Sequence, residues 1–387
     1  MSVGPLRSLR VVELGSGVAA AYAGKLFADL GADVVKIESP DGDVTRRHGP
    51  YPGGRVDPET SGLFLYLNSN KRGGVLDLDD AAGRRSFERL LARADVSFTD
   101  LPPKALESLG LLPAGQSRRH ERLVATAITP FGLTGPRRDW HASDLTLWNA
   151  GGVATLNGLG PGGDELPPLA AYGPQASLQG GINGAVATMG AIFARHRTGR
   201  GQTVDVSIQE CIATILELTL PFWPYCSLAA SRLGAKPIQP LDFFECKDGW
   251  IFLCAVEEHQ WKSFLDFIGN PEWAGIELFA DRLSRGANWD ALKPMIQEWM
   301  SEQNVQDIYR KLQERRVPIA PVSTMGDLLA SEHLNARGFF VSFDHPRAGK
   351  QRVPGAPFHF SRTPWELRRP APLLGQHTEE ILAEAGA

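Results

Sequence analysis

Cysteine, net positive charge and long apolar runs are all scarce in this sequence. The 387 residues include four cysteines and carry a formal net charge of −4. The cysteines lack the C-x-x-C spacing of a metal or redox site, which favours reduced, mostly buried thiols. An acidic chain is a poor partner for nucleic acid, and no apolar run approaches the length of a membrane span. We therefore expect no metal, no nucleic-acid partner and no membrane partner.

The overall composition is ordinary for a globular protein with two domains. Hydrophobic residues make up 43% of the chain and charged residues 22%. A chain of 387 residues also exceeds the size at which a single core usually stops growing. The N-terminus lacks the pattern of a secretory signal peptide. Together with the reduced cysteines, this predicts a cytoplasmic location.

The N-terminal part of the chain predicts a βαβ unit. Leu9–Leu14 is typical of a buried parallel strand, Ala19–Leu30 predicts a helix, and Asp33–Ile37 predicts a second strand. Such a unit starts a doubly wound parallel sheet. Gly15 and Gly17 in the connecting loop lack the G-x-G-x-x-G spacing, so they are a weak signal for a dinucleotide site.

The remaining pattern predicts an α/β protein with a large and a smaller domain. Further strands are expected at 75–78, 94–98 and 123–128, and a helix at 81–93. We expect the large doubly wound domain over 1–220, a linker over 221–240, a smaller α+β domain over 241–318, and a return to the large domain over 319–387. The smaller domain should open with a hairpin whose turn is Lys247–Gly249, followed by a helix that ends at Ile268.

The stretch Gly173–Gln202 is the organising segment of the chain. It predicts a glycine-rich turn, a helix and a basic turn that leads into a strand at Thr203–Val206. The start of such a helix can bring a substrate close to the backbone, but an N-cap with close packing also explains the glycines. Residues 151–163 predict a mobile lip over the site, and residues 209–220 predict another helix. The apolar positions at helical spacing predict one buried face, made of Ala185, Met189, Ile192 and Phe193.

Several segments carry a resemblance to a known family. They are, in order, LRVVELGSGVAAAYAGKLFADLGADVVKIESP, LNSNKRGGVLDL, RTGRGQTVDVSIQE, FFECKDGWIFLCAVEEHQW and APVSTMGDLLASEHLNARGFFV. Through them the chain resembles, over nearly its whole length, the family III CoA-transferases, which include formyl-CoA transferase, carnitine CoA-transferase and α-methylacyl-CoA racemase. The resemblance implies a CoA thioester and a carboxylic acid as substrates and no covalently bound cofactor. It also implies two interlocked subunits, as a homodimer or as a heterodimer with a paralogous subunit.

The catalytic residues implied by the resemblance are only partly present. Transferases of this family open the central helix with an aspartate that attacks the thioester, and Ser177 occupies that position here. No Asp or Glu lies between Tyr172 and Gly184, and a serine hydroxyl needs a base to become a nucleophile. The resemblance leaves Asp144 and Glu257 as acidic candidates. Each has a structural alternative, because Asp144 can cap a helix and Glu257 can complement a helix dipole.

The same resemblance implies contacts with CoA along the large domain. The residues at the expected contact positions are Gly17, Val18, Ala19, Lys71, Arg72, Leu101, Leu109 and His141. Arg46 belongs to a basic triplet that either faces the CoA phosphates or is solvated surface. Ser39 and Ser108 stand where the family has phosphate-binding arginines.

Three functions remain open at this point. The chain can be the subunit of a hetero-oligomeric CoA-transferase in which the partner supplies the nucleophilic aspartate. It can instead be a self-sufficient isomerase or racemase, lyase or dehydratase that acts on acyl-CoA through Asp144 or Glu257. It can also be a non-catalytic protein that binds CoA esters.

Overall fold

The chain divides into two compact units. The computed structural model describes residues 4–157, 167–217, 219–227, 229 and 239–386. The first unit comprises residues 1–232 and 336–387, and the second comprises residues 233–335. The second unit therefore contains the expected range 241–318 and extends beyond it at both ends.

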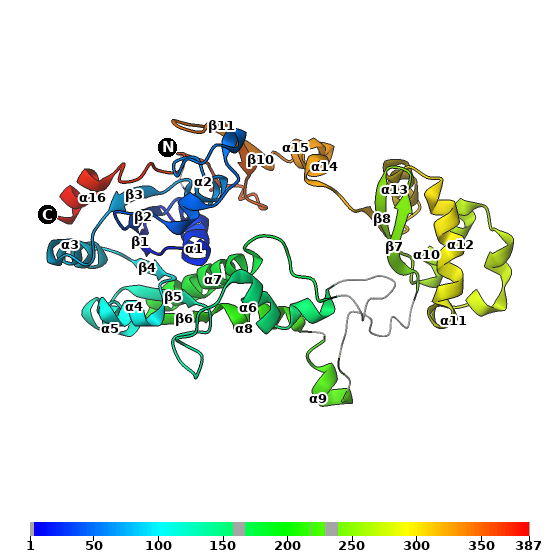
Figure 1. Cartoon of the computed structure of the whole chain (residues 1–387), viewed down its shortest axis with the longest axis horizontal. Coiled ribbons are helices and arrows are strands. Elements are labelled where there is room, and N and C mark those ends of the chain that lie inside the picture. The colour runs from blue at the N-terminus through cyan, green and yellow to red at the C-terminus, as the bar shows by residue number, and fades with distance from the viewer. Residues whose placement is uncertain (1–3, 158–166, 218, 228, 230–238, 387) are drawn as a thin grey trace. The chain divides into compact units, whose positions relative to one another are not determined.

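A six-stranded, fully parallel sheet forms the centre of the first unit (Figure 1). Its strands are β1 (Arg10–Leu14), β2 (Asp33–Glu38), β3 (Arg72–Val75), β4 (Val96–Thr99), β5 (Val124–Thr129) and β6 (Thr203–Ser207). Their spatial order is β3-β2-β1-β4-β5-β6, so the order reverses between β1 and β4. In open parallel sheets, ligands bind outside the carboxyl ends of the strands at such a reversal. The expected α/β architecture is confirmed.

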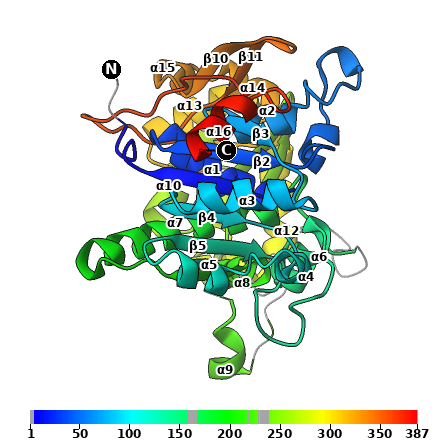
Figure 2. The same cartoon turned by 90° about the vertical axis from the view of Figure 1, so that its left-hand side faces the viewer.

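Helices pack on both faces of this sheet (Figures 1 and 2). Consecutive strand residues point to opposite faces, so Val11 joins one core and Val12 the other. One face is covered by α1 (Val18–Asp29), α6 (Asp144–Ala150), α7 (Gln175–Thr198) and α8 (Ile208–Ala213). The other is covered by α3 (Ala81–Leu91), α4 (Pro103–Ser108) and α16 (Thr378–Ala385). The first unit also contains α2 (Gly62–Asn68), α5 (Pro113–Arg119) and α9 (Phe222–Cys226).

The central helix α7 packs closely because glycines lie at its contacts. A Cβ atom on Gly181 would come within 2.8 Å of the Ala19 carbonyl oxygen in α1. A Cβ atom on Gly184 would come within 2.5 Å of the Ile128 Cδ1 in β5. Both distances are shorter than real contacts allow, so close packing explains these two glycines.

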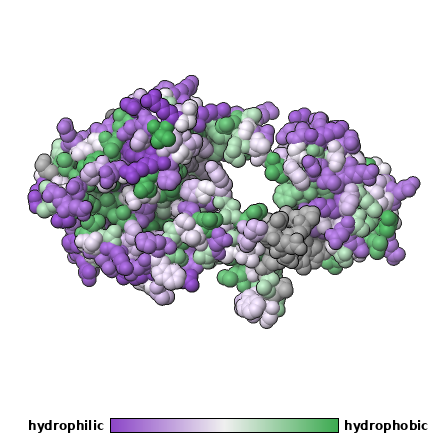
Figure 3. Space-filling view, viewed as in Figure 1, coloured by the Kyte–Doolittle hydropathy of each residue, from purple (hydrophilic) through white to green (hydrophobic). Residues whose placement is uncertain are grey.

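The apolar residues of α7 do not share one buried face as expected. Ala185 and Ile192 are buried, whereas Met189 and Phe193 are 38% and 63% exposed. The buried face consists largely of small residues, which a hydrophobic periodicity does not register. Apolar residues also lie among polar ones on the face of each unit shown in Figure 3, as on most protein surfaces.

The C-terminal segment packs on the β3 edge of the sheet. Arg72 on β3 pairs with Glu380 and Glu384 of α16, at 2.8 and 2.9 Å. The segment also contains an antiparallel hairpin, β10 (Phe340–His345) with β11 (Gly349–Pro354). The sequence pattern did not predict this hairpin.

The second unit is a small antiparallel sheet with helices packed on it. The sheet has the order β7-β8-β9, with β7 (Leu241–Cys246), β8 (Gly249–Cys254) and β9 (Ile319–Pro321). The predicted hairpin and its turn are confirmed by β7 and β8. The helices α10 (Glu258–Ile268), α12 (Trp289–Ser301) and α13 (Val305–Glu314) contribute to its core. The unit also contains α11 (Arg282–Ala287) and α14 (Met325–Ala330), and α15 (Glu332–Ala336) ends at the boundary between the units.

Some expected elements lie elsewhere in the structure. The strand β3 covers 72–75 rather than 75–78, because Gly73 and Gly74 face Pro372 and Ile381 and give the strand no apolar pattern of its own. The helix α8 ends at Ala213, and α9 lies within the expected linker. The segment 319–321 pairs with β8 in the second unit instead of returning to the large domain. Part of the expected lip, residues 158–163, lies outside the described residues.

Within the described ranges, no helix combines the length and the apolar character needed to cross a membrane.

Candidate functional site

A cavity of about 580 Å³ opens at the carboxyl end of the parallel sheet. Its wall includes Gly17, Val18 and Ala19, where the β1–α1 loop enters α1. The starts of α6 and α7 contribute Asp144 and Ser177. The cavity therefore lies where a doubly wound sheet holds its ligands, and its volume suits a small molecule or part of a larger one.

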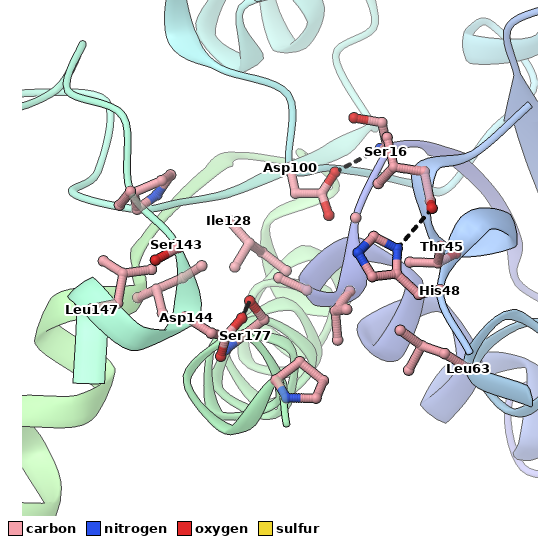
Figure 4. Close-up of a pocket in the computed structure, with 18 of the residues that line it drawn as sticks. Ser16, Thr45, His48, Leu63, Asp100, Ile128, Ser143, Asp144, Leu147 and Ser177 are labelled. Carbon is pink, nitrogen blue, oxygen red and sulfur yellow. Dashed lines mark hydrogen bonds between the residues drawn. The ribbon is translucent and has the colours of Figure 1, made fainter. Parts of the chain in front are cut away.

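The side chains of Asp144 and Ser177 are hydrogen-bonded across this cavity wall (Figure 4). The Ser177 hydroxyl donates to Asp144 Oδ2 at 2.5 Å, and the Ser177 backbone N–H donates to Asp144 Oδ1 at 2.9 Å. The residue at the N-cap of α7, Pro174, offers no side-chain cap. Asp144 therefore satisfies a free N–H in the first turn of α7, which is the work of a capping residue.

The same carboxylate also belongs to the first turn of α6. Ser143 caps that helix and forms a capping box with Thr146. Asp144 follows as the first residue of α6, where a negative charge complements the helix dipole. One partly buried carboxylate thus lies at the N-termini of two helices, which supports a capping role for Asp144. Asp144 also lines the cavity.

Asp100, which the sequence analysis did not select, is a second carboxyl group in the cavity wall. It follows β4 directly and accepts hydrogen bonds from the backbone N–H groups of Ser16 at 3.0 Å and Ala20 at 3.2 Å. Burial raises the pKa of this carboxyl to about 6. A Cβ atom on Gly15 would lie 2.5 Å from Asp100 Oδ1, so the glycine makes room for it. The available signal was a polar residue at the carboxyl end of a central strand.

His48 is the third ionisable residue in the wall and was also not selected. It follows the short 3₁₀ turn Val44–Arg47, and its Nδ1 lies 2.9 Å from the Val44 carbonyl oxygen. Because a carbonyl can only accept, Nδ1 carries the hydrogen and Nε2 is left for other partners. Figure 4 shows the imidazole on the opposite side of the cavity from Asp144 and Ser177.

A neighbouring cavity of about 360 Å³ contains the two leucines expected beside adenine. Leu101 and Leu109 line it together with residues that follow β1, β2 and β3. Ser16 lines both cavities, so they adjoin at the β1–α1 loop. The structure thus brings together the loop and the leucines, although they are far apart in the sequence.

Lys71 lines neither of these cavities. It is fully buried, and its Nζ donates to Glu13 Oε2 at 2.7 Å, to the Ala21 carbonyl at 2.7 Å and to Asn68 Oδ1 at 2.9 Å. Burial lowers the pKa of this ammonium to about 8. All three of its donors are used inside the protein, so the structure lends no support to the expected CoA contact.

Arg46 and Arg72 are also committed to partners in the chain. Arg46 forms a two-pronged pair with Glu38, at 2.7 and 2.8 Å, and contacts Glu59 at 2.9 Å. Arg72 pairs with Asp33 at 2.7 Å in addition to its contacts with α16. Neither residue lines the two cavities. Both arginines form ion pairs within the first unit, and the geometry gives the expected CoA contacts no support.

The last two expected residues lie apart from the cavity lining. His141 is exposed, three residues before α6. Glu257 belongs to the second unit, where it forms the N-cap of α10 in a capping box with Gln260 and pairs with Arg282 at 3.4 Å. No group of three or more His, Cys, Asp or Glu residues suited to a metal occurs in the described part of the chain.

Comparisons with known proteins give consistent results over the whole chain. The sequence model of CoA-transferase family III matches residues 6–378. The chain is 35% identical to the succinyl-CoA:(R)-benzylsuccinate CoA-transferase subunit BbsE of Thauera aromatica, over 97% of this chain and 93% of that one. It is 29% identical to the succinyl-CoA–L-malate CoA-transferase beta subunit of Chloroflexus aurantiacus, over 98% and 94%. A solved CAIB/BAIF family protein from Brucella suis superposes with a TM-score of 0.88, at 29% identity and full coverage of both chains.

Proposed function

We propose that this chain, which belongs to CoA-transferase family III, is the subunit of a hetero-oligomeric CoA-transferase that lacks the nucleophile. In this proposal it binds a CoA thioester, and a paralogous subunit interlocked with it supplies the attacking carboxylate. The observation that carries the proposal is Ser177, which occupies the start of α7 where family transferases have an aspartate.

The contacts of Ser177 explain why it does not replace the aspartate. Transfer in this family begins when a carboxylate attacks the thioester, whereas a serine must first lose its proton to a base. The acceptor of the Ser177 proton is the Asp144 carboxylate, at 2.5 Å. A carboxylate is far too weak a base to ionise an aliphatic hydroxyl. Ser177 therefore keeps its proton, and its role is to line the cavity and to donate a hydrogen bond to Asp144.

The named relatives support a role as one of two different subunits. BbsE is named as a subunit, and the relative from Chloroflexus is named as a beta subunit. In the proposal, the loop Gly17–Ala19 meets CoA and Leu101 and Leu109 receive the adenine. The adjoining cavity beside Ser177 would hold the acyl end. Lys71, Arg46 and Arg72 have structural roles instead.

A second candidate rests on the position of Asp144. Its carboxylate lies at the start of α7 and lines the cavity, so a self-sufficient enzyme could use it in place of the missing aspartate. Its two oxygens already accept hydrogen bonds from the backbone N–H and the hydroxyl of Ser177, so this carboxylate is engaged in capping α7. We therefore rank this candidate second, with Glu257 as a further acid, and place a purely CoA-binding protein third.

The deciding experiment measures CoA transfer from succinyl-CoA by the chain alone and together with its paralogous subunit. We expect binding of the thioester but no turnover by the chain alone, and turnover by the pair. Ser177→Ala in this chain should leave the turnover of the pair within about twofold, whereas removing the partner's nucleophile should abolish it. Full activity of the chain alone would overturn the proposal, and loss of that activity in Asp144→Asn would then establish the second candidate.

A further inference from the structure

The charge of the larger cavity is set by three ionisable groups. Among the described residues that line it, Asp100, Asp144 and His48 are ionisable, and none is a lysine or an arginine. Arg46 and Lys71, which do not line this cavity, pair with the carboxylates of Glu38 and Glu13. An anionic group that enters this cavity therefore finds one side chain able to carry a positive charge, and that side chain is His48.

The imidazole of His48 is held with one nitrogen available. Nδ1 donates to the Val44 carbonyl oxygen at 2.9 Å, which orients the ring and leaves Nε2 free of that contact. His48 lies across the cavity from Asp144 and Ser177 (Figure 4). A ligand whose thioester carbon lies near α7 would thus extend its far end towards His48.

We propose that Nε2 of His48, in the imidazolium form, binds the free carboxylate of a dicarboxylic acyl group carried on CoA. This inference rests on the proposed function and names its substrate class. A dicarboxylic acid joined to CoA through one carboxyl keeps a negative charge on the other. The names of the two relatives include succinate, benzylsuccinate and malate, which are all acids of this kind.

The carboxylates around His48 determine how this recognition depends on pH. Asp144 and Asp100 face the same cavity, and burial raises the pKa of Asp100 to about 6. The bond needs a proton on Nε2, because neutral imidazole with Nδ1–H presents a lone pair there. Preference for a charged acyl group should therefore decline as the pH rises and the imidazolium loses its proton.

The test compares two thioesters that differ in one carboxylate. Calorimetry of the full chain with succinyl-CoA and butyryl-CoA at pH 6 should show at least about tenfold tighter binding of succinyl-CoA, since a hydrogen bond to a charged group is worth that much. In His48→Phe, succinyl-CoA and butyryl-CoA should bind about equally, while the affinity for CoA itself stays unchanged. His196→Gln is the matched control, because His196 is exposed at the far end of α7 and lines neither cavity.

A titration separates His48 from the nearby carboxyls. The preference of the native chain should shrink between pH 6 and pH 8, and that pH dependence should vanish in His48→Gln, which keeps a donor without a titrating charge. Equal binding of the two thioesters by the native chain, or a preference that survives in His48→Phe, would overturn the inference and leave the proposed function standing. If neither thioester binds, both fail.

Discussion

Two groups of charged residues lie close together in the first unit, and they differ in how their charges are satisfied. The buried ion cluster, made of Glu13, Lys36, Asp43 and Lys71, is sealed, and its ion pairs are 2.7–2.8 Å long. The cavity wall, with His48, Asp100 and Asp144, leaves polar atoms facing open space. A lysine inside a family motif is therefore buried in an ion pair, while a histidine in a loop lines the cavity.

The largest expected effect comes from opening the buried ion cluster. Glu13→Ala should lower the free energy of unfolding by about 3–5 kcal/mol, because Lys36 and Lys71 would each lose a buried partner. Urea denaturation measures this loss, and soluble yield replaces it if the variant does not fold. Glu13→Gln, which keeps the size of the side chain, is the control for packing. A loss below about 1 kcal/mol would contradict the role assigned to the cluster.

A smaller effect is expected at Asp144. Asp144→Ala should lower the free energy of unfolding by about 1–2 kcal/mol, because α7 loses its acceptor at Ser177. Asp144→Asn retains an acceptor oxygen, so it should recover most of that loss. Thermal unfolding of the two variants measures the difference. Equal losses in both would show that the charge, and not the cap, is what stabilises α7.

The pH dependence of stability tests Asp100. Burial raises the pKa of its carboxyl from 3.8 to about 6, so the folded protein holds this proton more tightly than the unfolded chain. The native protein should therefore lose stability relative to Asp100→Asn as the pH rises from 4 to 6, and the difference should be constant above that range. Urea denaturation at several pH values follows it. A difference that does not change with pH would refute the raised pKa.

The smallest effect is expected at the surface of the second unit. The pair between Arg282 and Glu257 is 3.4 Å long, and both side chains are about half exposed. Arg282→Ala should therefore change the free energy of unfolding by less than about 1 kcal/mol. The same denaturation experiment applies, and a loss comparable to that of Glu13→Ala would remove the contrast between sealed and exposed charges.

Much of the fold was predictable because its signals are local. The strands β1 and β2 and the helix α1 follow from short apolar runs and a helical period, and β7 and β8 follow from their turn. The strand β3 was misplaced because its centre is Gly73 and Gly74, whose packing against the C-terminal segment leaves no trace in a pattern. The buried face of α7 was also missed, because it consists largely of glycine and alanine and has no apolar periodicity.

The site was less predictable because it depends on contacts between distant residues. Asp144 and Ser177 were both selected, but their hydrogen bond joins residues 33 positions apart. Asp100 and His48 were missed because only the folded chain brings them to the cavity. Asp100 lies there beside the β1–α1 loop, and His48 follows the 3₁₀ turn Val44–Arg47. Lys71 was assigned to CoA by resemblance, and nothing in the sequence shows that Glu13 and Asn68 surround its ammonium.

The contact of Gly181 with the Ala19 carbonyl has a consequence for the width of the ligand space. Ala19 and Ser177 both line the cavity, and Gly181 lies one helical turn beyond Ser177 in α7. Because Gly181 carries only a hydrogen atom where other residues carry a side chain, α7 and α1 can approach each other this closely. A methyl group at position 181 would push α7 away from α1 and so change the shape of the cavity, although Gly181 does not itself line it.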